Sequence, residues 1–211
     1  MFDDPRIERL RRSIGLRAPR RAGLPGDASA QCGSVDRAGA TPPREAGVAL
    51  LVRPRDTLEV LLIRRAELHG DPWSGHVALP GGRRAATDAD LLATACRETR
   101  EEVGIPLHAV GSLLGSLNEV APSSPLLPPL VIAPFVLAVP PDTHAHPDPR
   151  EVQAALWVPV DALRHPDAIS EITVELPDAS RAFPSLVYAD YEIWGLTLVI
   201  LQQFLALTAD G

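Results

Sequence analysis

Apolar residues from residue 47 onward occur in short runs separated by polar turns, a pattern typical of strands joined by loops. Two runs, at residues 48–52 and 58–63, enclose a turn at residues 53–57 and predict a β-hairpin. The other runs that predict strands lie at residues 77–79, 110–117, 130–139, 154–160, 172–176 and 186–188. Gly81 and Gly82 follow the first of these runs and are expected to end that strand.

Two longer segments have helical character. The first begins at Asp88 or Asp90, either of which can cap a helix N-terminus, and runs to residue 103, with Gly104 suited to end it. The second covers residues 196–207 and is apolar. Many strands with two substantial helices predict an α/β fold, in which an α/β/α sandwich surrounds a mixed β-sheet. A length of 211 residues suits one such domain.

The first 45 residues differ from the rest because they contain nine arginines and show no sustained periodicity after Leu16. Ile7, Leu10 and Ile14 recur at helical spacing, so we expect a short helix that docks on the domain or on the partner of a homodimer. Acidic residues disfavour the alternative of a transit peptide: Asp3, Asp4 and Glu8. We therefore predict an extension over residues 1–45 and a catalytic domain over residues 46–211.

Composition excludes several classes of protein. All 20 basic residues other than histidine are arginine, so a Schiff-base lysine and a P-loop lysine are both absent. The net charge of −7 disfavours a protein that coats nucleic acid. Two cysteines, Cys32 and Cys96, are too few for a disulfide scaffold and fit a reducing cytoplasm. The sequence contains no signal-peptide core and no apolar stretch of the roughly 20 residues that cross a membrane.

Candidate chemistry lies on the first predicted helix. Glu98, Glu101 and Glu102 have the spacing i, i+3 and i+4, which places them on one helix face. A second stripe, about 120° away, suits the core and contains Leu92, Cys96, Thr99 and Val103. Three adjacent like charges repel one another, so a compensating group is expected. Arg97 and Arg100 can supply part of it, and an ordinary solvated helix with such pairs is the alternative.

The glycine pair before this helix favours a ligand site. Glycine permits close approach of the backbone, and the Gly81 carbonyl can join the three carboxylates in an oxygen-only set of ligands. Such a set suits hard cations, so Mg²⁺ or Mn²⁺ is expected rather than zinc. Ions of this kind can bridge a diphosphate and lower the pKa of an attacking water. The sequence therefore predicts metal-dependent cleavage of a small anionic substrate.

Residues 82–105 resemble the Nudix pattern, which places a glycine and an acidic residue before a run of arginine, glutamates, glycine and an aliphatic residue. Asp88 stands where glutamate is usual, eight residues rather than seven separate it from Arg97, and Thr99 replaces an aliphatic residue. The resemblance implies a Nudix hydrolase with an α/β/α sandwich fold. It also implies that Arg97 orients the glutamates. The implied metal ligands are Glu98, Glu101, Glu102 and the Gly81 carbonyl, with Glu98 also a candidate general base.

Segments outside this pattern resemble the coenzyme A diphosphatase branch of the Nudix family. They are residues 61–66, 75–82, 134–136, 151–152 and 193–197. The branch implies hydrolysis of coenzyme A or an acyl derivative to a phosphopantetheine product and adenosine 3′,5′-bisphosphate. His76 stands where glutamine is usual, and the loop at residues 69–74 is altered. Two alternatives stay open: hydrolysis of another nucleoside diphosphate derivative, such as ADP-ribose or a nucleoside triphosphate, and a Nudix-like binding module without turnover.

Further residues are candidates for contact with substrate. The arginines around the glycine turn can meet phosphates or can line a solvated strand edge: Arg64, Arg65, Arg83 and Arg84. His76 is a candidate for the same region. Glu151 opens a strand and is a candidate metal ligand or base, with Glu119 as a weaker rival.

Aromatic and histidine side chains leave further alternatives. Trp73 can stack on an adenine or pack on its own domain, and Trp157 and Trp194 are expected in the core. His144 and His146 are expected in an exposed loop, because a zinc site would need further ligands.

Overall fold

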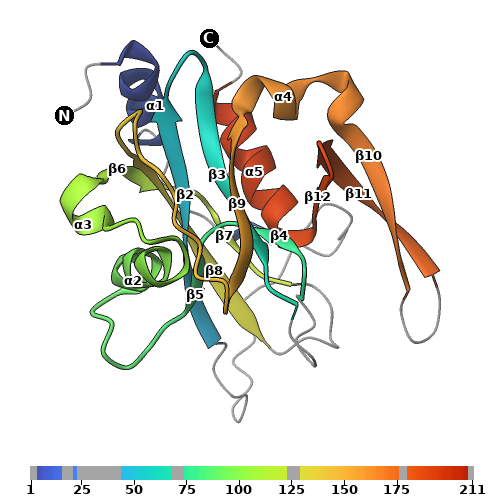
Figure 1. Cartoon of the computed structure of the whole chain (residues 1–211), viewed down its shortest axis with the longest axis horizontal. Coiled ribbons are helices and arrows are strands. Elements are labelled where there is room, and N and C mark those ends of the chain that lie inside the picture. The colour runs from blue at the N-terminus through green and yellow to red at the C-terminus, as the bar shows by residue number, and fades with distance from the viewer. Residues whose placement is uncertain are drawn as a thin grey trace.

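The computed structural model describes residues 4–15, 21–22, 44–67, 74–122, 129–175 and 180–208. Within them a mixed β-sheet lies between helices, which confirms the α/β prediction (Figure 1). The larger sheet contains β1 (Arg21–Ala22), β2 (Arg44–Pro54), β3 (Leu58–Arg65), β4 (Val77–Ala78), β5 (Gly81–Arg83), β6 (Ser112–Ser116), β7 (Glu119–Val120), β8 (Leu130–Ala138) and β9 (Val152–Pro159). A smaller sheet contains β10 (Ile169–Glu175), β11 (Ser180–Tyr188) and β12 (Tyr191–Trp194). The helices are α1 (Pro5–Gly15), α2 (Leu91–Val103), α3 (Leu107–Val110), α4 (Val160–Arg164) and α5 (Gly195–Leu207), with a 3₁₀ turn at Pro166–Ala168.

The long strand β2 organises the larger sheet. It pairs with β3 in the antiparallel hairpin that the sequence predicted, with Val52 opposite Val60. Its other edge pairs with β8 in parallel, with Val48 opposite Pro134. The sheet is therefore mixed, and its main path runs β1, β7, β8, β2, β3, β4.

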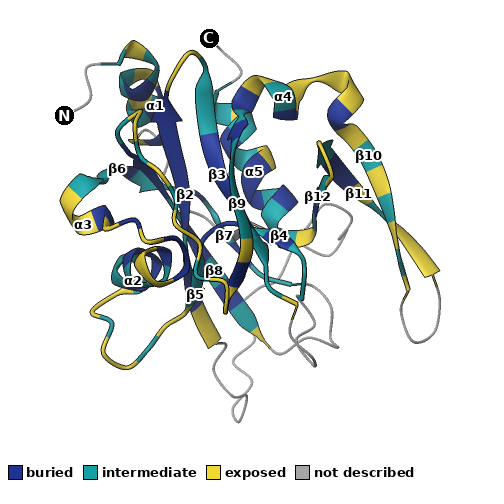
Figure 2. Cartoon of the chain, in the orientation of Figure 1, coloured by how far each residue is buried: buried dark blue, intermediate teal, exposed yellow. Residues whose placement is uncertain are grey.

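Alternate residues of the central strands enter two separate cores, because side chains of a strand point to opposite faces in turn. Leu50 and Leu62 belong to the core that α1 and α5 cover, which we call the α5 face. Leu51 and Leu61 belong to the core that α2 covers, which we call the α2 face. The buried strands in Figure 2 thus separate the two layers of helices.

The predicted short helix near the N-terminus corresponds to α1. Ile7, Leu10 and Ile14 are buried in the core of the α5 face, so this helix packs on the domain of its own chain. The division of the chain at residue 45 stays a prediction. No helix in the described part of the chain has the length and apolar character needed to cross a membrane.

One prediction about the strands was wrong. Gly81 and Gly82 do not end a strand but lie within β5, which pairs with β2 antiparallel, with Gly47 opposite Gly82. A β-carbon on Gly81 would lie 2.5 Å from the Gly47 carbonyl oxygen, so only glycine permits this approach. Pattern reading also missed the short elements β7, α3 and α4, which lack a period long enough to recognise.

The smaller sheet extends beyond the body of the domain. Its strand order is β10, β11, β12, and exposed residues alternate with half-buried ones along β10 (Figure 2). The edge strand β12, which lies against β4 of the larger sheet, leads directly into α5, and the Thr197 hydroxyl in that helix donates a hydrogen bond to the Val77 carbonyl in β4, at 3.1 Å. This contact ties the smaller sheet to the edge of the larger one.

Candidate active site

Local signals set both ends of α2. Asp90 caps its N-terminus by accepting a hydrogen bond from the Ala93 amide at 2.7 Å. Gly104 ends it in the left-handed conformation, with φ of 69°. Gly47 lets the helix approach β2 closely, since a β-carbon there would overlap the Leu91 carbonyl oxygen. The helix is thus held firmly against the sheet at the point where β5 pairs with β2.

The glycines of β5 hold two of the glutamates. The Gly81 amide donates a hydrogen bond to Oε2 of Glu102 at 2.8 Å. A β-carbon on Gly82 would lie 2.5 Å from Cδ of Glu98, so the Glu98 carboxylate rests directly on this glycine. The glycine pair therefore forms a cradle for carboxylates of α2.

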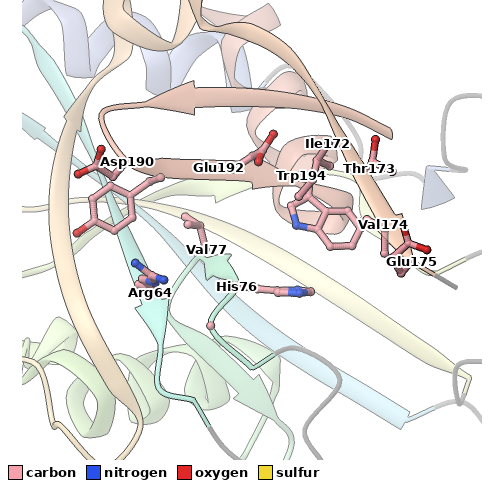
Figure 3. Close-up of a pocket in the computed structure, with 12 residues that line it drawn as sticks. Arg64, His76, Val77, Ile172, Thr173, Val174, Glu175, Asp190, Glu192 and Trp194 are labelled. Carbon is pink, nitrogen blue, oxygen red and sulfur yellow. The ribbon is translucent and has the colours of Figure 1, made fainter. Parts of the chain in front are cut away.

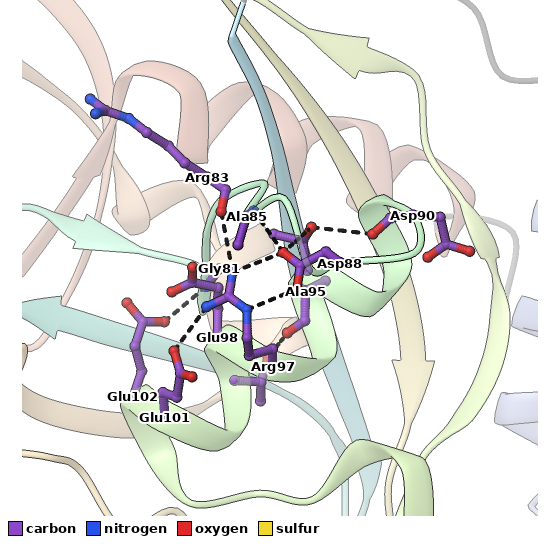
Figure 4. Close-up of polar contacts among 12 residues, drawn as sticks. Gly81, Arg83, Ala85, Asp88, Asp90, Ala95, Arg97, Glu98, Glu101 and Glu102 are labelled. Carbon is purple, nitrogen blue, oxygen red and sulfur yellow. Dashed lines mark hydrogen bonds and ion pairs between the residues drawn. The ribbon is translucent and has the colours of Figure 1, made fainter.

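Arg97 pairs with three carboxylates, those of Asp88, Glu98 and Glu101 (Figure 4). Its guanidinium donates to both carboxylate oxygens of Asp88, each at 3.0 Å. The same group pairs with Glu98 at 2.8 Å and with Glu101 at 2.9 Å. It also donates to the Arg83 carbonyl at 3.2 Å. One arginine thus links the loop before α2 to two glutamates on it, as a planar fork of donors allows.

Asp88 is the partner that orients Arg97 despite the extra residue between them. Its carboxylate also accepts hydrogen bonds from the Ala85 amide at 2.8 Å and the Thr94 hydroxyl at 2.9 Å. Hydrogen bonds from Arg97 and then Ala85 hold the pKa of Asp88 far below its usual range. The helix begins after Asp90, so the two aspartates divide the tasks of pairing and capping.

Burial affects the three glutamates unequally. The Glu102 residue is only 2% exposed, and this desolvation raises its pKa to about 8, against the lowering effect of the Gly81 amide. Desolvation also raises the pKa of Glu98, although Arg97 opposes the shift. Glu101 is exposed. Along the predicted stripe, solvent exposure therefore decreases from Glu101 through Glu98 to Glu102.

Thr99 replaces an aliphatic residue without loss of packing. It is fully buried, and its hydroxyl donates to the Ala95 carbonyl one turn earlier at 2.7 Å. The hydroxyl is thereby satisfied within the helix. Cys96 and Val103 are buried on the same side, which confirms the predicted core stripe.

The residues of this site fit a hard divalent cation in chemistry. The carboxylates and the backbone of the glycine pair in β5 offer oxygen atoms, and the desolvation of buried Glu102 and half-buried Glu98 favours a nearby cation. Within the described ranges, no three acidic, histidine or cysteine side chains converge on one point as they stand. Glu98 and Glu101 are instead paired with Arg97. Metal binding by the three glutamates therefore stays a proposal.

The residues predicted to bind substrate divide between the two faces of the larger sheet. Arg65 lies opposite Val152, which belongs to the core of the α2 face, and its charge lowers the pKa of Glu102. Arg64 lies opposite Val77, which belongs to the core of the α5 face. Together with His76 it lines a cavity of 390 Å³ (Figure 3). The consecutive residues Arg64 and Arg65 therefore lie on opposite faces of the larger sheet.

Glu151 lies on the side of the glutamates. It is exposed in the turn before β9, and its charge raises the pKa of both Glu98 and Glu102. The loop before it docks on the end of α2, where the His146 amide donates to the Val103 carbonyl at 2.8 Å and the Asp148 amide to the Glu102 carbonyl at 2.9 Å. Sequence reasoning missed these backbone anchors.

The other predicted residues lie on several strands and loops of the larger sheet. Arg83 is exposed and contributes its carbonyl, and Arg84 pairs with Glu45 at 3.1 Å. Glu119 is half-buried in β7. The side chains of His144 and His146 are exposed, as expected.

The predictions for the three tryptophans can now be compared with their positions. Trp157 is half-buried against the core of the α2 face, with the Arg53 guanidinium 4.2 Å above its ring. Trp157 and Trp194 were both expected in the core, but each is only half-buried, and Trp194 lines the cavity. Trp73 lies outside the described residues.

Comparison with known proteins assigns the chain to a family. A model of the NUDIX domain matches residues 41–176. The uncharacterized Nudix hydrolase NudL of Enterobacter sp. is 31% identical over 76% of this chain and 80% of its own length. NudL of Photorhabdus laumondii is 34% identical over 76% of this chain and 82% of its own length. An uncharacterized protein of Schizosaccharomyces pombe is 34% identical, but this chain spans only 48% of it.

Solved structures agree with this assignment at the level of the fold. A MutT/nudix family protein from Enterococcus faecalis has a TM-score of 0.54 at 20% identity, over 81% of this chain and 64% of that one. An Ap4A hydrolase of C. elegans has a TM-score of 0.52 at 17% identity, over 80% of this chain and 99% of that one. With the domain match over residues 41–176 and the similarity to NudL, these findings show that the chain belongs to the Nudix hydrolase family.

Proposed function

We propose that this Nudix hydrolase cleaves the diphosphate linkage of coenzyme A or an acyl derivative, releasing a phosphopantetheine product and adenosine 3′,5′-bisphosphate. Its family acts on nucleoside diphosphate derivatives and generally uses divalent metal ions. The choice of coenzyme A rests on the resemblance of residues 61–66 and 75–82 to the diphosphatase branch. The name of the NudL relatives specifies no substrate, so the choice requires a direct test.

The observation that carries the proposed chemistry is the cluster that Arg97 and the glycine cradle assemble. Arg97 joins Asp88, Glu98 and Glu101, while Gly81 holds Glu102. We assign metal binding to the three glutamates with the Gly81 carbonyl, and Mg²⁺ or Mn²⁺ as the ion. When bound, the ion would neutralise charge on the diphosphate and lower the pKa of the attacking water.

The side chains have separate proposed roles in the reaction. Water adds to one phosphorus atom, the bridging P–O bond breaks, and the leaving phosphate keeps the bridging oxygen. Glu98 accepts the proton of this water, and Glu151 is the alternative acceptor because its charge acts on the same carboxylates. Arg97 keeps Glu98 and Glu101 in position. Arg65 lies on the same face and can bind a substrate phosphate.

A second candidate substrate is another nucleoside diphosphate derivative, such as ADP-ribose or a nucleoside triphosphate. His76 supports it, because this residue stands where the coenzyme A branch has glutamine and it lines the cavity in Figure 3. The chemistry at α2 would be the same for either substrate. Only the groups that hold the rest of the molecule would differ.

A panel of substrates tests both candidates. The full chain is incubated with coenzyme A, acyl derivatives, ADP-ribose and nucleoside triphosphates, with Mg²⁺ or Mn²⁺, and products are identified by mass. Adenosine 3′,5′-bisphosphate from coenzyme A is the expected result. Turnover of ADP-ribose or triphosphates alone would select the second candidate. If no substrate in the panel is hydrolysed, both candidates are contradicted and the binding module without turnover is favoured.

A further inference from the structure

The cavity on the α5 face lies between the two sheets and apart from the side of the larger sheet that α2 covers. Its 390 Å³ are bounded by Arg64 and His76 at the edge of the larger sheet, and by Tyr191, Glu192 and Trp194 of β12 (Figure 3). It is lined by none of the residues that the Arg97 network joins, which are Asp88, Arg97, Glu98 and Glu101, nor by Glu102. The strand β4 nevertheless connects the two regions, because Val77 borders the cavity and Gly81 follows four residues later.

The walls of the cavity combine aromatic and charged groups. The Trp194 ring contacts the His76 ring, with 5.0 Å between centroids, and the Phe183 ring, with 5.9 Å between centroids. Three carboxylates line the cavity against one guanidinium: Glu175, Asp190 and Glu192 against Arg64. This excess of negative charge disfavours a phosphate or another anion as the occupant. A small neutral or cationic ring that offers hydrogen-bond donors is favoured.

Glu192 is prepared to accept such a hydrogen bond. The hydroxyl of Ser185, which is only 3% exposed, donates to Oε1 of Glu192 at 2.8 Å and orients the carboxylate. A carboxylate has about four acceptor positions, so it can accept a further donor. The Arg64 guanidinium forms no hydrogen bond or ion pair with the described residues, so its donors are available for ring nitrogen or oxygen atoms.

We propose that this cavity binds a planar heterocycle that carries an exocyclic amine, with the amine donating to Glu192 and the ring packed against Trp194. Nucleobases such as adenine have this combination of a stacking face with donors and acceptors on the edge. Such a ring has two sources. It is either the base of the hydrolysed substrate, in which case the inference rests on the proposed function, or a free nucleoside that binds separately.

Calorimetric titration of the full chain with adenosine tests the inference without turnover. Purine riboside is the matched ligand, because it has the same rings and ribose but lacks the amine. We expect adenosine to bind about tenfold more tightly, as befits a hydrogen bond to a charged acceptor. No heat with adenosine at about 5 mM, or equal affinity for the two nucleosides, would overturn the proposal.

Variants locate the binding and separate its two sources. Glu192→Gln keeps the size of the side chain and should reduce the ratio of adenosine affinity to purine riboside affinity. Glu171→Gln, at an exposed position of β10 that does not line the cavity, should leave this ratio unchanged. An unchanged preference in folded Glu192→Gln would contradict the assigned acceptor. If adenosine raises the KM of hydrolysis without lowering kcat, the ring is the substrate's own base. If adenosine binds without affecting KM, the ring comes from a free nucleoside. Failure of hydrolysis with binding intact would reject the proposed function alone.

Discussion

The two faces of the larger sheet differ in how their charged side chains are paired. On the α2 face, Arg97 pairs with three carboxylates at once: Asp88, Glu98 and Glu101. On the α5 face, the carboxylates around the cavity outnumber the single guanidinium of Arg64, which forms no ion pair with the described residues. A closed network suits chemistry that needs fixed geometry, whereas open donors and acceptors suit recognition of a ligand.

The largest expected effect comes from removing a charge on the α2 face. Glu98→Gln keeps the volume of the side chain but removes a proposed metal ligand and proton acceptor, so kcat should fall by about a hundredfold or more. Initial rates at saturating substrate and metal measure it, with a thermal melt to verify folding. Glu171→Gln on β10 is the control and should keep full activity. Normal turnover by Glu98→Gln would remove this residue from the mechanism.

The second largest effect is expected from substitution of Asp88, with the same substitution at Asp90 as the control. Asp88→Asn breaks the two-oxygen contact with Arg97 and should lower kcat by about tenfold to a hundredfold, the range typical of groups that orient a metal ligand. Asp90→Asn should have little effect, because asparagine caps a helix as well as aspartate does. Rates of both variants at several metal concentrations provide the comparison. Equal loss in the two variants would show that Asp88 acts only through helix stability.

The consecutive arginines of β3 test the comparison of faces most directly. Arg65→Gln removes charge beside Glu102 and should lower kcat, whereas Arg64→Gln should raise KM by about threefold to tenfold and leave kcat unchanged. Steady-state kinetics with the substrate chosen by the panel measure both. If both variants change the same parameter, the two faces do not divide chemistry from recognition.

The sequence predicted the α2 face better than the α5 face for a physical reason. The spacing of Glu98, Glu101 and Glu102 is a local property of one helix, so one segment contains most of the signal. The cavity instead joins residues of β3, β4, β10 and β12, and no local pattern connects them. The opposite directions of Arg64 and Arg65 follow from the two-residue period of a strand, whereas the pairing of β5 with β2 depends on a close approach that only the fold provides.

The smallest expected effect concerns acid stability at the α2 face. Asp88 has a lowered pKa in the folded protein because Arg97 and the Ala85 amide favour its charged form. Its stabilisation is therefore complete above the pKa of the unfolded chain, about 4, and is lost as pH falls through the lower folded value. Thermal melts of wild type and Asp88→Asn should differ at pH 7 and converge in acid. A difference in melting temperature that persists at the lowest pH would mean that Asp88 stabilises the loop by its neutral hydrogen bonds to Ala85 and Thr94, so that the charge of Arg97 is held mainly by the glutamates.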